Sequence, residues 1–245
     1  MNLFKIVLAV LFPNKCLGCG EILNEGEFLC EYCHAMIERT AKDKLCLKCG
    51  LPKKKCDCSK YIFRFDRTVA PFYYNGIAKR IMYRFKFRHK EYASLFFAQQ
   101  MALCVKQNYS DIEFSAVTYV PMLKRSELKR GYNQSKLLAR DLAVILNLPL
   151  SEDLLGVKPK KHTQHKLPLS KRFENVKNKY FCNYSVQGKK ILLVDDIKTT
   201  GATLDECAKQ LLRSGADRVY CVTGLITNTK DAKKKNPIQK SGLEF

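Results

Sequence analysis

The sequence lacks an apolar run long enough to cross a lipid bilayer. Its opening stretch, MNLFKIVLAVLFPNKC, is interrupted by Lys5 and holds no small-residue cleavage site. Because a membrane-spanning helix needs about 20 apolar residues, we expect neither a transmembrane span nor a signal peptide. We expect this segment to dock on the protein itself, with contact to a membrane surface as the alternative. The expected compartment is the cytoplasm.

Acidic residues are scarce in this chain. Its 245 residues include 23 Asp and Glu against 44 Lys and Arg, which gives a formal net charge of +21. Residues 1–60 carry a net +3 and residues 61–245 a net +18. Such an excess indicates a polyanionic partner, namely nucleic acid, an anionic membrane face or a phosphate-rich ligand. The alternative is a surface of solvated lysines without a specific partner.

Three further absences narrow the class of protein. No Gly-rich loop is followed by GK[ST], which excludes a P-loop nucleotide site. The long second part of the chain shows no internal repeat. No acidic or amide cluster marks a pocket for a purine, a pyrimidine or orotate.

Cysteine, by contrast, is abundant and clustered. Eight of the 12 cysteines fall in the first 58 residues, as three C-x2-C pairs and one C-x-C pair. Tight turns of this kind aim two thiolates at one metal ion, which predicts structural zinc, one or two ions, held entirely by protein ligands. A disulfide-stapled secreted module is the alternative. The simplest assignment pairs the cysteines in sequence order, although an interleaved pairing is also compatible. The two sets are Cys16, Cys19, Cys30 and Cys33, and Cys46, Cys49, Cys56 and Cys58.

The remainder of the chain has the pattern of an α/β domain. The apolar runs KKILLVDD and RVYCVTGLI flank the helical pattern TLDECAKQLLRSG, and strand–helix–strand succession implies parallel pairing. We also expect strands within 61–75 and 115–121, a basic aromatic segment and a helix after Gly76, and a helix over SKLLARDLAVILN. The expected organisation is a zinc-ribbon module (1–60), an α/β domain (61–228) and a basic tail (229–245).

The junction ILLVDDIKTTGATL combines two carboxylates with a loop of hydroxyls. If Asp195 and Asp196 end a parallel strand, the loop 199–203 leads into a helix N-terminus, where open α/β sheets bind ligands. Loop N–H groups and threonine hydroxyls there suit a phosphate monoester, whereas the carboxylates suit hydroxyls or a divalent cation. Together they predict a ribose 5-phosphate derivative. A response-regulator-like acidic pocket and a capped helix with solvated carboxylates are the alternatives.

VDDIKTTGATL resembles the 5-phosphoribosyl-1-pyrophosphate (PRPP) signature of type I phosphoribosyltransferases. The whole chain resembles the ComF family of competence proteins (ComFC and GntX-like). LFPNKCLGCG, VPMLKRSELKRGYNQS and QHKLPLSKRFENV carry the resemblance, which spans nearly all of residues 10–226. It implies a type I phosphoribosyltransferase-like sheet behind a double zinc ribbon.

The resemblance also implies roles for individual residues. Asp195 and Asp196 contact the ribose hydroxyls, directly or through water on Mg²⁺, and with Arg130 form the catalytic set. A hood over 158–180 departs from the family pattern, because Lys161 replaces the usual threonine and Thr163 lies nearby. The implied 5-phosphate site comprises Thr199, Thr200, Gly201, Ala202 and Thr203. The implied pyrophosphate and hood residues are Pro121, Met122, Lys124, Asn133, Gln134, Gln164, Leu167, Arg172, Asn175 and Val176. Gly131 and Tyr132 match the family's R-G-[FY]-N-Q motif together with Arg130, Asn133 and Gln134.

Three functions follow as hypotheses. The family resemblance implies a PRPP-binding competence factor that acts on incoming single-stranded DNA, beside a competence helicase and the inner-membrane uptake machinery. In AKRIMYRFKFRHK (78–90), Lys and Arg alternate with apolar and aromatic residues, which can track a phosphate backbone while rings stack on bases. The same spacing also fits burial in a core. The other hypotheses are an active phosphoribosyltransferase on a small base or nucleic acid, and an adaptor for DNA or protein with a vestigial PRPP site.

Overall fold

The computed structural model describes residues 13–41, 45–56, 58–59, 61–159 and 172–227. The elements named below are, in chain order, α2 (Glu31–Met36), η2 (Lys53–Lys55), β1 (Arg67–Val69), β2 (Phe72–Tyr73), α3 (Gly76–Phe87), α4 (Ala93–Asn108), β3 (Ala116–Tyr119), α5 (Lys124–Arg130), α6 (Gln134–Leu146), β4 (Leu155–Val157), α7 (Arg172–Val176), β5 (Tyr180–Cys182), β6 (Lys190–Lys198), α8 (Ala202–Arg213) and β7 (Arg218–Ile226).

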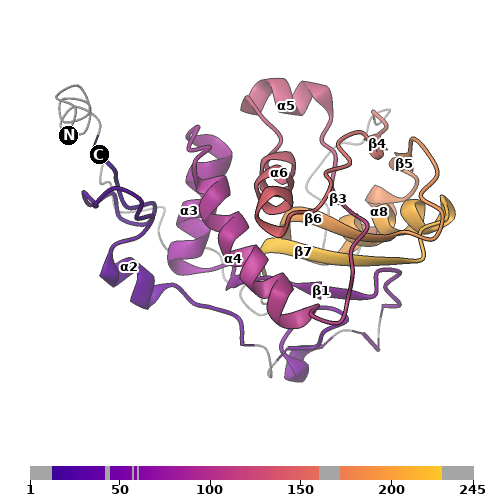
Figure 1. Cartoon of the computed structure of the whole chain (residues 1–245), viewed down its shortest axis with the longest axis horizontal. Helices are drawn as coiled ribbons and strands as arrows, with labels where there is room; N and C mark the ends of the chain where they lie inside the picture. Colours follow the sequence, from indigo (N-terminus) through magenta and orange to yellow (C-terminus); the bar gives the residue numbers. More distant parts are fainter. Residues whose placement is uncertain (1–12, 42–44, 57, 60, 160–171, 228–245) are drawn as a thin grey trace.

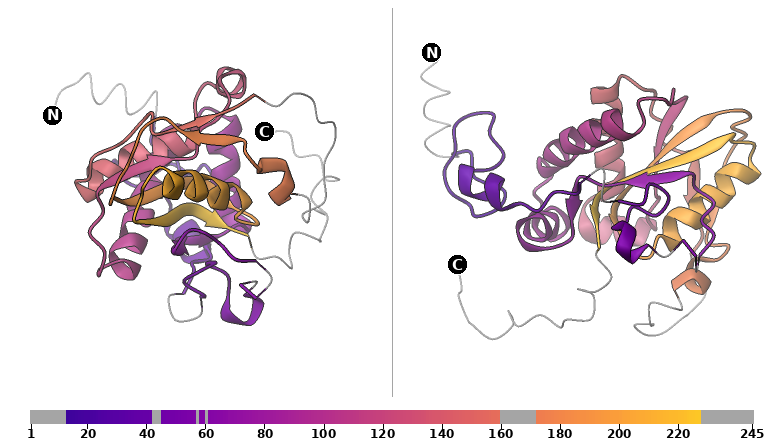
Figure 2. Two further views of the ribbon diagram at one scale, coloured as in Figure 1. Left: turned by 90° about the vertical axis from the view of Figure 1, so that its right-hand side faces the viewer. Right: turned by 90° about the horizontal axis from the view of Figure 1, so that it is seen from below.

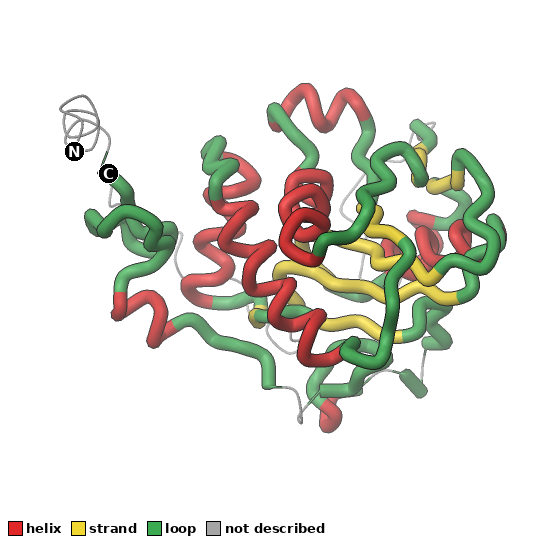
Figure 3. Tube along the Cα trace, in the orientation of Figure 1, coloured by secondary structure: helices red, strands yellow, loops and turns green. Residues whose placement is uncertain are grey.

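A parallel sheet forms the centre of the protein (Figures 1 and 3). Its strands lie in the order β1–β7–β6–β3, and β2 pairs with the far end of β7. Every pairing in this sheet is parallel. The parallel α/β sheet predicted from the sequence is therefore confirmed.

Strand β6 is longer than the run KKILLVDD indicates. It continues through the two aspartates to Lys198, with Asp195 opposite Thr223 and Ile197 opposite Leu225. Strand β7 makes this possible, because its apolar run keeps offering backbone partners as far as Ile226. The expectation that the aspartates end the strand is therefore wrong, because both lie within β6 and the strand continues to Lys198.

Helices cover both faces of this sheet. Leu192 and Val194 of β6 belong to a core shared with α3, α4 and α6, whereas Ile191 and Leu193 belong to a core shared with α8. Because successive side chains of a strand point to opposite faces, α8 lies across the sheet from α3, α4 and α6 (Figure 2). The four side chains are all 0% exposed, as expected for a strand buried on both faces.

Two segments form helices that the sequence does not predict. The stretch after Gly76 forms both α3 and α4, not a basic segment followed by one helix, and LKRSELKR contains α5. Lys and Arg obscure a helical period in α3, whose buried positions recur at intervals of three and four and lie on one face. These buried residues are Ala78, Ile81, Met82 and Phe85.

Helix α8 ends at the glycine that the sequence indicates. Gly215 has φ +95°, its N–H donates to Leu212 O, and the N–H of Ala216 donates to Leu211 O, both at 3.1 Å. This pair of bonds is the Schellman arrangement. Among the described residues, no helix combines the length and apolar character needed to cross a membrane.

The two cysteine turns dock at different places on the α/β body. In the first, the Arg84 guanidinium of α3 donates to Leu17 O at 2.8 Å and Gly18 O at 3.0 Å. In the second, the N–H of Thr68 in β1 donates to Leu47 O at 2.8 Å. Each turn therefore packs against its own part of the body.

Candidate functional site

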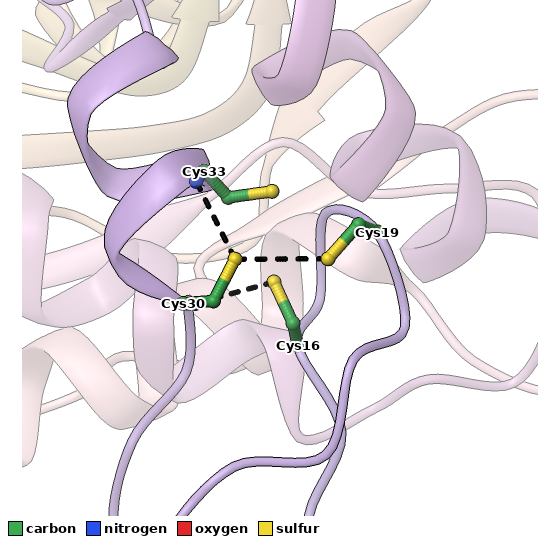
Figure 4. A group of neighbouring side chains, drawn as sticks. All are labelled: Cys16, Cys19, Cys30 and Cys33. Atoms are coloured by element: carbon green, nitrogen blue, oxygen red, sulfur yellow. Dashed lines mark hydrogen bonds between the residues drawn. The ribbon is translucent and has the colours of Figure 1, made fainter.

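The first four cysteines bring their sulfur atoms together (Figure 4). Cys16 and Cys19 come from a turn, while Cys30 caps α2 and Cys33 lies within it. All four sulfurs lie within 4.8 Å of one another, and Cys19 Sγ is 3.7 Å from Cys30 Sγ. Two ligands of a tetrahedral zinc with Zn–S bonds of about 2.3 Å are separated by about 3.8 Å, so the cluster fits this metal.

The second four cysteines repeat the arrangement. Cys46 Sγ lies 3.8 Å from Cys58 Sγ, and Cys49 Sγ lies 3.7 Å from Cys56 Sγ. These separations are far longer than a disulfide bond of about 2.05 Å. The two groups of four follow the sequence order, so that pairing is confirmed and the interleaved one is wrong.

Backbone N–H groups favour the thiolate form of Cys16 in the first cluster. Burial raises the pKa of the Cys16 thiol, but hydrogen bonds from the N–H groups of Cys19, Cys30 and Gly18 outweigh it and lower this pKa to about 6. Thiolates are the form of cysteine that binds metal. With four protein ligands in each group, the chemistry of a bound zinc would be structural and not catalytic.

A pocket of about 190 Å³ opens where β6 turns into α8. The first N–H groups of an α-helix have no intrahelical partner and point at this kind of space, which favours an anion. All five residues that the resemblance assigns to the 5-phosphate line the pocket. Its lining comprises Asn175, Val176, Asp195, Ile197, Lys198, Thr199, Thr200, Gly201, Ala202, Thr203 and Leu204.

Two residues shape the floor of this pocket. Lys198 is 2% exposed, and its ammonium lies 5.6 Å from the centre of the Phe63 ring. Gly201 has φ +82°, and a Cβ there would lie 3.1 Å from both Phe63 Cε1 and Lys198 Cε. Glycine is therefore needed at 201 for its backbone conformation and for space.

We predict that Gly201→Ala weakens anion binding as well as folding. A residue with a Cβ in the left-handed region costs about 1–2 kcal/mol, and the crowded methyl would displace Lys198. Gly188→Ala is the matched control, because Gly188 has φ +68° but no atom within 4 Å of its Cβ position. Urea unfolding should show a loss of stability in both variants, larger in Gly201→Ala because of the crowding, whereas only Gly201→Ala should lose affinity for inorganic phosphate. Equal phosphate affinity in both would contradict the prediction.

Asp195 lies at the edge of the pocket, held by its neighbours. Its Oδ1 accepts from Ser135 Oγ and from the Asp196 N–H, both at 2.9 Å. Burial, and next the Asp196 carboxylate, raise the pKa of Asp195 to about 7, although these hydrogen bonds lower it. A carboxyl group with a raised pKa readily binds a cation or hydroxyl groups, because either one stabilises the charged form that burial disfavours.

Asp196 has a different environment from Asp195. Its Oδ2 lies 2.6 Å from the Lys86 ammonium of α3, and the two side chains are 13% and 16% exposed. Asp196 is not among the residues that line the pocket. The structure therefore places the first carboxylate at the threonine loop and the second against α3.

The residues of the RGYNQ motif connect α5, α6 and α3. Asn133 caps α6 by accepting from the N–H groups of Ser135 and Lys136, and its Nδ2 donates to Val120 O at 3.3 Å. Arg130 donates to Gln134 Oε1 at 3.3 Å, and the Tyr132 hydroxyl donates to the backbone of α3 at Phe85 O.

The other implied pyrophosphate residues lie before this motif. Pro121 and Met122 are half-buried after β3, and Lys124 is exposed at the start of α5. Gly131, within the motif itself, has φ +86°. None of them lines the pocket at the threonine loop. Their distance from a bound pyrophosphate stays a prediction.

Only the borders of the hood are described. Strands β4 and β5 pair in an antiparallel ribbon around it, and Asn175 and Val176 of α7 line the pocket. Lys161, Thr163, Gln164 and Leu167 lie outside the described residues, as does the side chain of Arg172.

The basic aromatic segment 78–90 divides between core and surface. Its buried apolar residues face the sheet, whereas Tyr83 and Phe87 are 54% and 52% exposed, with ring centres 5.1 Å apart. Arg84 and Lys86 bind partners within the protein, as described above. The burial interpretation thus holds for the inner face, and the outer face keeps an exposed aromatic pair.

Sequence patterns did not reveal three residues of the site. Lys198 stands in the spacer between the aspartates and the threonines, to which the sequence pattern assigns no role. Ser135 and Lys86 belong to helices whose contacts with β6 are set only by the tertiary fold. A serine directly after the NQ pair was the one available signal for Ser135.

Comparisons with known proteins give the following matches. Residues 7–61 match the family model of the double zinc ribbon domain. The DNA utilization protein YhgH of Escherichia coli is 28% identical over 221 residues, covering 86% of this chain and 96% of YhgH. Competence protein ComFC of Bacillus subtilis is 30% identical over 209 residues, covering 79% and 82%. A hypoxanthine phosphoribosyltransferase from Staphylococcus aureus aligns with 61% of this chain and 70% of its own, with 18% identity and a TM-score of 0.37.

Proposed function

The chain belongs to the ComF family of competence proteins, and we propose that it binds Mg²⁺–PRPP beside β6 and acts on single-stranded DNA during natural transformation. The observation that carries this proposal is the pocket at the N-terminus of α8, which joins the threonine loop to Asp195. One end of it suits a phosphate and the other a ribose.

The 5-phosphate would lie in the threonine loop. Backbone N–H groups at the start of α8, the hydroxyls of Thr199, Thr200 and Thr203, and the positive end of the helix dipole all favour a doubly charged anion. Lys198 lines the same pocket and adds a positive charge. These groups supply the anchoring that a phosphoribosyl ligand needs without any rearrangement of the strand.

The ribose hydroxyls and Mg²⁺ would lie beside the two aspartates. Carboxylate oxygens are ligands that Mg²⁺ prefers, usually with several of its waters retained. Bound Mg²⁺ would neutralise pyrophosphate charge and make it a better leaving group. Asp195 would hold a ribose hydroxyl from the pocket side, with Ser135 fixing the orientation of its carboxylate. Asp196 would join this set once Lys86 releases it.

Single-stranded DNA would cross the exposed side of α3 and α5. Tyr83 and Phe87 offer ring faces to bases, and stacking on aromatic rings is tolerant of sequence. Lys124, Arg125 and Lys129 on α5 are exposed and can contact phosphates. A competence helicase and the cytoplasmic face of the inner membrane complete the proposed setting.

We predict that calorimetry detects Mg²⁺–PRPP binding that depends on the aspartates. The wild type should bind one PRPP per chain, and Asp195→Asn/Asp196→Asn should bind at least about 100-fold more weakly. Two lost contacts to charged groups, at about 1.5–3 kcal/mol each, correspond to at least that factor. Asp153→Asn/Asp217→Asn is the matched control, because both carboxylates are exposed and the charge change is the same.

The outcomes separate the three hypotheses. Binding lost only in the first variant supports the proposal, and pyrophosphate release on addition of a base or DNA would extend it to turnover. Absence of heat in the wild type would contradict it. DNA binding that falls with salt and is indifferent to Asp195→Asn would then identify the chain as an adaptor.

A further inference from the structure

Lys86 forms an ion pair with Asp196, the carboxylate that the proposed ligand needs. Its ammonium lies 2.6 Å from Asp196 Oδ2, and both side chains are mostly withdrawn from solvent. Partial burial strengthens this pair compared with a surface ion pair. Asp196 in the ligand-free protein is therefore already neutralised by a cation from α3.

Mg²⁺ at the aspartates is incompatible with this position of Lys86. A divalent ion that shares Asp196 would lie within a few ångströms of the ammonium, and like charges at that separation repel strongly in a partly buried site. The lysine must therefore withdraw when Mg²⁺ and the ribose reach this carboxylate.

Lys86 is placed in the last turn of α3, beside the exposed aromatic pair. Tyr83 and Phe87 are four positions apart on the outer face, and the Arg130 guanidinium lies 5.6 Å from the centre of the Phe87 ring. Arg130 in turn donates to Gln134 at the start of α6, next to Ser135, which holds Asp195. Both aspartates are thus linked to the surroundings of Phe87: Asp196 through Lys86, the chain neighbour of Phe87, and Asp195 through Ser135, the chain neighbour of Gln134.

We propose that Lys86 is a positioning residue that links Asp196 to the exposed aromatic face of α3. Occupation of the acidic pair by Mg²⁺–PRPP displaces the ammonium, and the last turn of α3 reorients with Phe87 and Arg130. Ligand binding at the acidic pair thereby changes the conformation of the surface proposed to bind nucleic acid. This inference rests on the proposed function, because it needs PRPP at the acidic pair.

The chain offers a direct reporter for this link, because it contains no tryptophan. Phe87→Trp introduces one indole at a half-exposed position under the Arg130 guanidinium. Titration of Phe87→Trp with Mg²⁺–PRPP should change the tryptophan emission, with the same midpoint as the heat measured by calorimetry. In Phe87→Trp/Lys86→Met, which keeps the length of the side chain but not its charge, the heat should remain and the emission change should disappear. Lys86→Arg should restore it.

A second readout follows from competition for Asp196. Without the ammonium, Mg²⁺ no longer has to displace a cation from Asp196. Lys86→Met should therefore lower the Mg²⁺ concentration needed for half-saturation with PRPP. The expected decrease is about 5- to 10-fold, which is in the range of a typical coupling between sites. A role confined to stability would leave this concentration unchanged.

Each outcome decides one question. Heat without an emission change in Phe87→Trp overturns the link and leaves the proposed function standing. An emission change that survives Lys86→Met also overturns it, because the signal then travels by another route. Absence of heat in the wild type overturns the proposed function and the link with it.

Discussion

Replacement of Cys49 by serine is expected to destabilise the whole α/β body and to remove one zinc ion per chain. Cys49 and Leu51 are 0% and 3% exposed and belong to the core beneath α8. A Cβ on Gly50, between them, would lie 3.0 Å from Thr68 O of β1 and 2.8 Å from Ile226 Cδ1 of β7. The turn that holds the second cluster is therefore in direct contact with the sheet.

The expected size of this effect follows from the energetics of structural zinc. Sites of this kind bind zinc with apparent free energies of about 10–16 kcal/mol, as large as the entire stability of a typical domain, about 5–15 kcal/mol. We expect Cys49→Ser to lower the free energy of unfolding by more than about 3 kcal/mol. Urea unfolding monitored by circular dichroism measures this loss, and the zinc content of the variant is determined in parallel.

Cys19→Ser is the matched control for the second cluster. Cys19 is exposed, whereas Cys49 is 0% exposed, so Cys19→Ser should also lose one zinc but should lower the free energy of unfolding by less than Cys49→Ser does. Equal destabilisation by the two substitutions would contradict the account, as would a full zinc content in Cys49→Ser.

Asp195→Asn is expected to stabilise the ligand-free protein while weakening PRPP binding. The pKa of Asp195 is raised to about 7 by burial and by Asp196, compared with about 3.9 in an unfolded chain. The folded protein therefore binds an extra proton between these values, and wild-type stability falls as the pH rises from about 4 to 7. Asparagine keeps the oxygen that accepts from Ser135 and carries no charge.

The stability difference between Asp195→Asn and the wild type is expected to depend on pH. Near pH 4 the carboxyl group is protonated in the folded state, and the two proteins should differ little in stability. At pH 8 wild-type Asp195 carries its full buried charge, so Asp195→Asn should be more stable by on the order of 2 kcal/mol. Asp153→Asn, at an exposed carboxylate, should show no such gain. Urea unfolding at the two pH values measures this, and a variant that is less stable than the wild type at pH 8 would contradict it.

Local sequence patterns predict the parts of this protein that are built from neighbouring residues. The cysteine pairs need only a tight turn, so their spacing predicts the zinc ligands, but it leaves open which pairs share one metal ion, and the fold decides this. Strand β7 and helix α8 follow from apolar periodicity and from Gly215, whose positive φ ends the helix. The threonine loop follows for the same reason, because one turn brings all its residues together.

Contacts between distant segments are where prediction from the sequence stops. Ser135 and Asp195 are 60 positions apart, and neither residue indicates the other. Lys86 was grouped with a strip of basic residues for DNA, but the packing of α3 on the sheet brings it to Asp196. The extension of β6 through the aspartates likewise depends on its neighbour β7. Periodicity within one element does not contain this information.

The most direct test of the account is the position of the 5-phosphate in crystals grown with Mg²⁺–PRPP. A second cavity of about 180 Å³, between the second cysteine turn and α4, provides the competing location. Thr68 lines it, and the hydroxyl of this residue is, among the described residues, the buried side-chain polar group without a hydrogen-bond partner. The account predicts density for the phosphate against Thr199–Thr203, with Asp195 at the ribose and Lys86 withdrawn from Asp196. Density for PRPP in the second cavity, with the threonine loop free, would contradict it.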